Sequence, residues 1–175
     1  KEIIFLSTPY DEASVDLLEA LDVPAFKIAS TDITNIPLLC YIAKIGRPMI
    51  LSTAMATMEE VEESVAAVRE KGLNDIAVLQ CTGNYPARLT DSNLRVINTY
   101  RKKLHCVVGY SDHTPDVINP IAATAMGAKI YEKHFTLDKT LPGPDHRMSL
   151  DPQELKQTVK AIRKTEGALG ISEKQ

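Results

Sequence analysis

The sequence predicts an α/β protein that folds as a (β/α)8 barrel (TIM barrel), with about six of the strand–helix units present in one domain over residues 1–175. Three observations point to this class. Short apolar runs alternate with amphipathic segments, successive runs begin roughly 22 to 30 residues apart as in βαβ units, and polar side chains follow every run.

The apolar runs are short and rich in Ile and Val, which favours strands that are buried on both faces of a parallel sheet. The expected strands are Ile3–Ser7, Ala25–Ser30, Met49–Thr53, Ile76–Cys81, Cys106–Tyr110 and Lys129–Phe135.

The segments between these runs have the three-and-four spacing of amphipathic helices. The expected apolar faces are Val15, Leu17, Leu18 and Leu21 in the first and Met58, Val61, Val65 and Val68 in a later one, and the last helix runs from Pro152 to about Leu169. A capping box formed by Thr57 and Glu60 would begin the later helix. Gly46, Gly72 and Gly127 come where helices should end.

Polar residues at the strand ends decide between two architectures. A barrel brings the carboxyl ends of all its strands to one mouth, whereas an open doubly wound sheet brings together only the ends beside its switch point. The polar residues at or just past these ends are Thr8, Lys27, Ser30, Thr53, Thr82, Asn84, Tyr85, Ser111, His113, Glu132 and His134. Because every end carries one, the barrel is favoured.

Composition argues against several classes of function. A formal net charge of −3 gives no general basic field for nucleic acid. No apolar run approaches the roughly 20 residues of a membrane span, and the first residues lack the features of a signal peptide. Cys40, Cys81 and Cys106 show no paired metal-binding spacing, so they are expected to be reduced thiols in a cytoplasmic protein.

Two histidines are the candidate metal ligands. His113 and His134 are 21 residues apart, one βα unit, so they should come from neighbouring strands. Neutral imidazoles in that arrangement can converge on one divalent cation and leave positions open for substrate and water, with Asp112 and Glu132 as outer partners. The alternative is that each histidine is satisfied by a backbone carbonyl.

Lys27 is a charge within an apolar strand. Such a lysine is costly to bury unless an anion meets it, and in a barrel mouth a phosphate or carboxylate ligand would do so. Ser30 would add a hydroxyl donor, and Asp32 could balance the charge. The alternative is that the stem follows the strand while the ammonium group reaches water.

Two loops hold further polar candidates. Prolines and a glycine in Leu141–Arg147 would present Asp145 rigidly, and Asn84 with Tyr85 precedes a proline that ends regular structure. Each could equally be a simple turn. Glycine-rich phosphate loops, nucleophile elbows and CxxC motifs do not occur, which argues against nucleoside triphosphate, serine-hydrolase and thioredoxin-like chemistry.

Seven short motifs in order resemble the bacterial N-acetylneuraminate (sialic acid) synthases over essentially the whole chain. They are Ser7-Thr8-Pro9, Lys27-Ile28-Ala29-Ser30, Leu51-Ser52-Thr53-Ala54-Met55, Gln80 to Pro86, Gly109-Tyr110-Ser111-Asp112-His113, Glu132 to Lys139 and Gly143-Pro144-Asp145-His146.

The resemblance implies a transferase of carbohydrate biosynthesis that condenses phosphoenolpyruvate with an open-chain N-acylmannosamine to give a sialic-acid-type nonulosonic acid and phosphate. It implies Mn2+, or another divalent cation such as Mg2+ or Co2+, on His113 and His134. The residues that match the family's phosphoenolpyruvate contacts are Thr8, Lys27, Ser30 and Ser111, those that match its sugar contacts are Tyr85 and Asp145, and Asn84 and Asp32 match an amide and an acidic side chain of some members.

The chain also departs from the family's pattern. The resemblance implies two further upstream strand–helix units, with another lysine and a glutamate, and an antifreeze-like carboxyl-terminal domain that acts across a homodimer. We therefore expect little or no synthase activity from these 175 residues alone. The competing interpretations are a legionaminic or pseudaminic acid synthase and a truncated, non-catalytic binding or assembly module.

Overall fold

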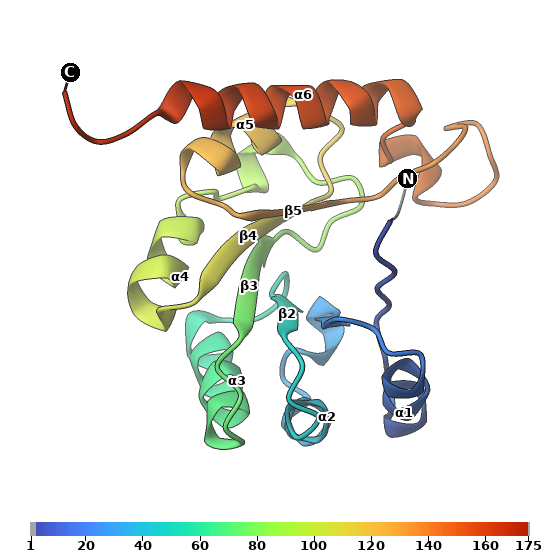
Figure 1. Ribbon diagram of the computed structural model, residues 1–175. Coiled ribbons are helices and arrows are strands. Elements are labelled where there is room, and N and C mark those ends of the chain that lie inside the picture. Colours follow the sequence, from blue (N-terminus) through green and yellow to red (C-terminus); the bar gives the residue numbers. More distant parts are fainter. Residues whose placement is uncertain (1–2, 175) are drawn as a thin grey trace. The chain divides into compact units, whose positions relative to one another are not determined.

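The computed structural model describes residues 3–174, which form an α/β chain of alternating strands and helices (Figure 1). The elements in order are α1 (Glu12–Ala20), β1 (Phe26–Ile28), η1 (Ser30–Asp32), α2 (Ile36–Ala43), β2 (Met49–Ser52), α3 (Met58–Glu70), β3 (Ile76–Cys81), η2 (Leu89–Asp91), α4 (Val96–Leu104), β4 (Val107–Asp112), α5 (Ile118–Ala125), β5 (Ile130–Lys133), η3 (His146–Met148) and α6 (Pro152–Leu169).

The strands pair in parallel, and their order in the sheet is β1-β2-β3-β4-β5, the order of the chain. A doubly wound sheet reverses its strand order at a switch point, and these strands show no reversal. Consecutive units of a (β/α)8 barrel have this unbroken order. The parallel α/β class is therefore confirmed, and the closed eight-stranded barrel stays a prediction.

Contacts within the chain group it into two compact units. The first comprises the described residues up to Leu79 together with Tyr100–Val107, and the second comprises Gln80–Thr99 with the described residues from Val108 onward. Each unit is described by itself below.

The core of the first unit forms where helices cover the strands that precede them. Phe26 and Ile28 of β1 and Met49 and Leu51 of β2 are fully buried, and their pairing and alternation place all four on one face of the sheet. Helix α2 packs against α1 on one side and α3 on the other. In α1 the expected apolar face is only half right, since Val15 and Leu18 are buried and Leu17 and Leu21 are exposed.

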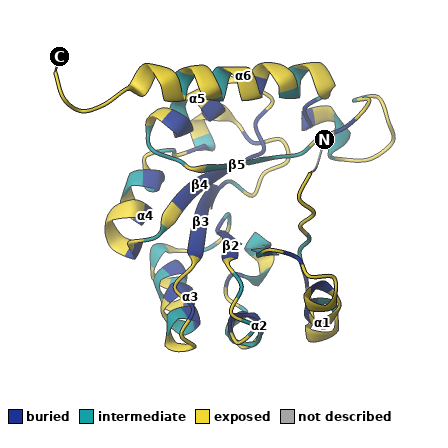
Figure 2. Ribbon diagram, in the orientation of Figure 1, coloured by how far each residue is buried: buried dark blue, intermediate teal, exposed yellow. Residues whose placement is uncertain are grey.

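In the second unit, β4 is buried almost throughout while β5 is half-buried at each of its four residues (Figure 2). Helix α6 packs against α5, and Thr158 is the buried residue among those described in α6. The long last helix has the predicted bounds. No helix among residues 3–174 combines the length and the apolar character that a membrane span requires.

Helix ends follow the local signals of the sequence. The Thr57 hydroxyl accepts from the Glu60 amide and the Glu60 carboxylate accepts from the Thr57 amide, so the predicted capping box is present at α3. Gly72 follows the carboxyl end of α3 with a φ of 89°, a backbone conformation that favours glycine.

The predicted strand at Ile3–Ser7 is wrong for the described chain. This segment has no regular secondary structure, and Ile3 and Phe5 are 89% and 61% exposed. An apolar run becomes a strand only when its amide and carbonyl groups pair with a neighbouring backbone, and Ile3–Ser7 has no such pairing within residues 3–174. The structure therefore shows five strands over the described residues where six were expected.

A substitution in the capping box tests whether its hydrogen bonds stabilise the start of α3. Thr57→Ala should lower the free energy of unfolding by about 1 kcal/mol, because one orphan amide of the first turn loses its acceptor. Urea denaturation of Thr57→Ala, compared with Glu59→Ala in the same turn, measures this effect. Equal effects of the two substitutions would contradict the cap, since Glu59 contributes only its charge near the helix amino terminus.

Candidate active site

The parallel pairing of β4 with β5 brings the two candidate histidines together. Ser111 lies beside Glu132 and Asp112 beside Lys133 in the register, and a histidine follows each strand. The centres of the His113 and His134 rings are 5.3 Å apart, and their planes meet at 63°. The prediction that neighbouring strands supply both histidines is thus confirmed by the geometry.

The hydrogen bond of His113 determines which of its ring nitrogens is free. His113 is only 5% exposed, and its Nδ1 lies 2.7 Å from the carbonyl oxygen of Thr82. A carbonyl oxygen can only accept, so Nδ1 carries the proton and Nε2 of the neutral ring keeps its lone pair. Burial lowers the pKa of His113 more than the Thr82 carbonyl raises it. The neutral form that a metal requires is therefore favoured.

His134 lies near a carboxylate of the loop that follows β5. Its Nδ1 lies 3.7 Å from a carboxylate oxygen of Asp145, and both side chains are partly exposed. This distance is too long for a hydrogen bond but short enough for electrostatic attraction to a protonated ring. The structure therefore brings Asp145 to the histidine pair.

Tyr85 packs on both imidazoles. Its ring centre is 4.0 Å from that of His113, with a tilt of 31°, and 5.6 Å from that of His134, nearly edge-on at 87°. Because Tyr85 remains 52% exposed, its ring forms an outer wall of the pair. Asn84, beside it, is exposed on the same loop.

The face that carries the histidines also carries the carboxylate of Glu132, which was expected near them. Ser111 donates its hydroxyl proton to Glu132 at 2.7 Å. Side chains alternate between faces along a strand, so Ser111 and Glu132 each share a face with the histidine two residues later. The sequence predicts the alternation of side chains along each strand. It does not predict the register between the two strands, which is a property of the tertiary structure.

One sequence interpretation needs correction. Asp112 and Glu132 were expected as the outer partners of the histidines; this stays a prediction for Glu132 and is wrong for Asp112, since the ring nitrogens contact the Thr82 carbonyl and Asp145. Asp112 lies on the opposite face of the strand, where it accepts hydrogen bonds from Thr114 and Tyr131. A backbone carbonyl such as that of Thr82 cannot be identified as a partner from residue types.

The first unit holds the cationic candidate. The Lys27 ammonium group donates to the Ser52 hydroxyl at 2.8 Å and to the Ile28 carbonyl at 3.0 Å, and its side chain is half-buried. The Ser30 hydroxyl oxygen accepts from the Ala54 amide at 2.9 Å. The carboxyl ends of β1 and β2 are thereby joined around an ammonium group that can meet an anion.

The other two candidates of the first unit have local roles in the structure. The Asp32 carboxylate accepts from the Thr31 hydroxyl at 2.9 Å and from the Asn35 amide group at 3.3 Å, and Asn35 caps α2. This geometry orders the turn into α2 rather than pairing Asp32 with Lys27 as expected. Thr8 is half-buried in a segment without regular secondary structure.

The histidine pair fits a metal that takes few protein ligands. Within residues 3–174 no group of three or more His, Cys, Asp or Glu side chains could hold a metal ion. Two imidazoles with a free Nε2 on His113 could hold a cation whose other positions are taken by water or substrate oxygens. Cys81 is buried, and its Sγ lies 3.7 Å from His113 Nδ1. That nitrogen already donates to the Thr82 carbonyl.

Comparisons with known proteins agree with this architecture. A model of the NeuB family matches residues 1–174. The N,N'-diacetyllegionaminic acid synthase of Legionella pneumophila is 45% identical over 177 residues, which cover 99% of this chain and 50% of that protein.

Two solved structures are similar at the level of the whole chain. The spore coat polysaccharide biosynthesis protein SpsE of Bacillus subtilis has a TM-score of 0.93 at 48% identity, covering 98% of this chain and 49% of that one. The sialic acid synthetase of Leptospira borgpetersenii, in complex with citrate, has a TM-score of 0.94 at 37% identity, covering 99% and 60%. The chain spans about half the length of the curated relatives it matches.

The environment of His113 predicts a pH dependence of stability. The pKa of His113 in the metal-free protein should lie below its usual value of 6.5, because the ring is buried. The folded state then binds this proton less tightly than the unfolded state, so the free energy of unfolding should fall as the pH drops below about 6.5.

NMR of the imidazole nitrogens measures both the titration midpoint and the position of the proton, which should be on Nδ1. His113→Asn should weaken the pH dependence of unfolding over this range. A midpoint above 6.5, or a proton on Nε2 of the neutral ring, would contradict the assignment.

Proposed function

The chain belongs to the NeuB family, and from that premise we propose that the whole protein condenses phosphoenolpyruvate with an open-chain N-acylmannosamine. The products would be a sialic-acid-type nonulosonic acid and phosphate. The relatives at 45% and 42% identity that are named as legionaminic acid and N-acetylneuraminate-9-phosphate synthases support this class of reaction. The observation that carries the proposal is the pairing of two imidazoles at the ends of β4 and β5.

His113 and His134 would hold Mn2+, or Mg2+ or Co2+, which when bound supplies Lewis-acid polarisation of the sugar aldehyde. The Thr82 carbonyl keeps the His113 proton on Nδ1 and so leaves Nε2 as the ligand atom. One oxygen of the Asp145 carboxylate would orient the ring of His134, and the other would accept a hydrogen bond from a sugar hydroxyl.

Lys27 would bind an anionic group of phosphoenolpyruvate. A half-buried ammonium group that already has two hydrogen bonds is held in place, so an incoming phosphate or carboxylate gains a charge-assisted bond at small entropic cost. Thr8, Ser30 and Ser111 would add hydroxyl groups. Ser111 would donate to the substrate once its proton turns away from Glu132.

The proposed bond changes balance without a redox partner. The methylene carbon of phosphoenolpyruvate forms a bond to the aldehyde carbon, and the aldehyde oxygen takes up a proton. Water then adds to the carbon that bears the phosphate ester and loses one proton, and the new hydroxyl loses its proton to become the ketone as the C–O bond breaks and phosphate leaves with its bridging oxygen and that proton. Tyr85 and Asn84 would contact the sugar, and Asp32 would supply an acidic group. The residues of the chain bind, orient and neutralise charge.

Experiments can distinguish this proposal from two other functions. A legionaminic or pseudaminic acid synthase would use a different acylated sugar, and comparing kcat/KM of the complete enzyme for the candidate sugars separates them. A non-catalytic binding or assembly module would bind neither Mn2+ nor phosphoenolpyruvate. We also propose the closed (β/α)8 barrel, a cytoplasmic location and a homodimer for the whole protein.

Removing either histidine tests the metal site. His113→Ala and His134→Ala should each weaken Mn2+ binding by more than about 100-fold, because loss of one ligand should cost at least as much as loss of an outer partner. A Mn2+ titration monitored by electron paramagnetic resonance measures the affinity. Removal of the metal with a chelator should abolish turnover by the whole protein.

The matched control is His105→Asn, because His105 is exposed and has a φ of 48° that asparagine tolerates. This variant should bind Mn2+ as the parent protein does. Unchanged Mn2+ affinity in both alanine variants would rule out the histidine pair as the metal site.

Replacing the ammonium group tests the anion site. Lys27→Met should weaken phosphoenolpyruvate binding by about 10- to 100-fold, since a hydrogen bond to a charged group contributes roughly 1.5–3 kcal/mol. Lys44→Met is the control, because Lys44 is an exposed residue at the end of α2. Isothermal titration with phosphoenolpyruvate should show the loss in the first variant alone, and equal affinities would count against Lys27 as the anion-binding group.

A further inference from the structure

The face of β4 and β5 opposite the histidines holds a buried ionic cluster. Asp112 is fully buried. One of its carboxylate oxygens accepts from the amide and the hydroxyl of Thr114, both at 2.8 Å, and the other accepts from the Tyr131 hydroxyl at 2.8 Å. Lys133, with a side chain only 3% exposed, has its ammonium nitrogen 3.9 Å from the same second oxygen.

This cluster ties the two residues that flank His113 to the residue that precedes His134. Asp112 and Thr114 flank His113 in the chain, and their two hydrogen bonds close a tight turn around it. Lys133, which precedes His134, donates to the carbonyl oxygen of Thr114, which follows His113. The backbones that carry the two rings are therefore joined by side chains as well as by the strand ladder.

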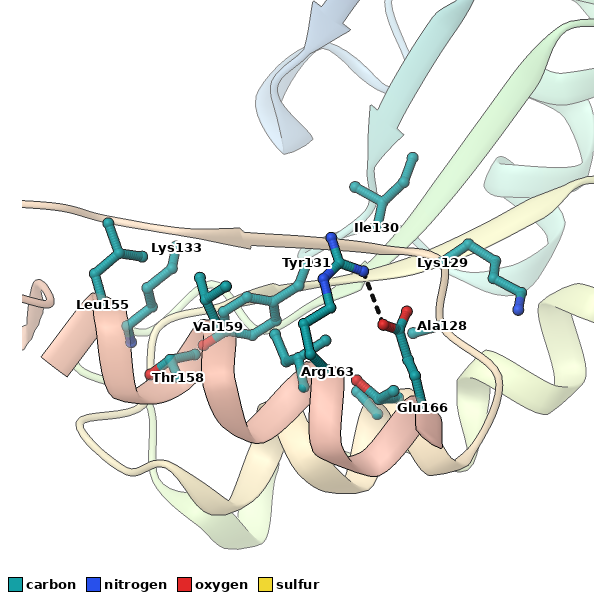
Figure 3. A pocket seen from close by; sticks show the side chains of 13 residues that line it. Ala128, Lys129, Ile130, Tyr131, Lys133, Leu155, Thr158, Val159, Arg163 and Glu166 are labelled. Carbon is teal, nitrogen blue, oxygen red and sulfur yellow. Dashed lines mark hydrogen bonds and ion pairs between the residues drawn. The ribbon is translucent and has the colours of Figure 1, made fainter. Parts of the chain in front are cut away.

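The space between β5 and α6 would allow the Lys133 ammonium group to take another position. Tyr131 and Lys133 project from β5 toward α6, and between them and the helix lies a cavity of about 300 Å3 (Figure 3). The Thr158 hydroxyl on the wall of this cavity is buried without a hydrogen-bond partner among the described residues. An ammonium group released from Asp112 and Thr114 could turn toward that space, so those two residues keep it at the strand end.

Stability alone does not require such a cluster. Replacing a buried ion pair with apolar residues of similar volume is often neutral or stabilising, whereas removing one partner strands a buried charge. What the ionic pair adds is a directional contact between the ends of two particular strands. That contact acts on the residues next to the histidines.

We propose that Asp112, Tyr131 and Lys133 are positioning residues that hold His113 and His134 at the separation a shared cation requires. They act through the Thr114 backbone and the ends of β4 and β5, and they touch neither ring. The inference rests on the proposed function, since it assigns a support to the same metal site.

Variants of two hydrogen-bonded tyrosines in the full protein test the proposal. Tyr131→Phe removes the hydroxyl that binds Asp112, and Tyr110→Phe is the matched control, because Tyr110 is a fully buried β4 tyrosine whose hydroxyl accepts from Asn119. Tyr131→Phe should weaken Mn2+ binding about 10-fold and Asp112→Asn about 100-fold, the range found for outer partners of metal ligands. Tyr110→Phe should lower Tm to a similar extent as Tyr131→Phe and leave Mn2+ affinity within about twofold.

A second readout does not depend on metal. NMR of the imidazole nitrogens should show a single His113 tautomer in the parent and in Tyr110→Phe, and a mixture or exchange broadening in Tyr131→Phe and Asp112→Asn. Parent-like Mn2+ affinity in these two variants would overturn the positioning role while the metal site stands. If the parent protein binds no Mn2+, the proposed function fails instead, and the imidazole spectra alone then decide whether the cluster positions the rings.

Discussion

Strands β4 and β5 pair in parallel so that Ser111 lies beside Glu132 and Asp112 beside Lys133. Because successive side chains point to opposite faces, this register sorts the strand ends into two sets. Ser111 and Glu132 share one face with the histidines that follow, while Asp112, Tyr131 and Lys133 share the other. A slip of one residue would exchange the sets and separate the imidazoles, so the candidate site depends on this pairing.

The two faces deal with charge in different ways. On the histidine face, burial lowers the pKa of His113 and favours the neutral ring, while the acceptor-only carbonyl of Thr82 holds its proton on Nδ1 and leaves the lone pair on Nε2. On the opposite face, burial is the main reason that the pKa of Tyr131 is raised, with the charge of Asp112 adding to it, so Tyr131 stays a hydrogen-bond donor. Burial thus favours the neutral form of His113 on one face and of Tyr131 on the other.

The first compact unit also holds a polar group in place by hydrogen bonds, in this case the ammonium group of Lys27. Lys27 lies in the strand β1 between the fully buried Phe26 and Ile28, yet its ammonium group finds a hydroxyl and a carbonyl at the ends of β1 and β2. Those contacts hold the ammonium group in place. A group prepared in this way favours an anionic ligand.

Sequence alone determined the class of fold, the capping of α3 and the identity of the histidine pair, because these follow from periodicity, local hydrogen bonding and the order of strand and polar residue. Tertiary structure decided what depends on contacts between distant segments. Ile3–Ser7 has the composition of a strand but finds no backbone partner in the described chain, and half of the expected α1 face is exposed. Asp112 was placed beside the histidines by proximity in sequence, yet alternation and register set it on the opposite face. The Thr82 carbonyl that selects the His113 tautomer has no signature in residue type, because every residue has a carbonyl and only the fold brings this one to the ring.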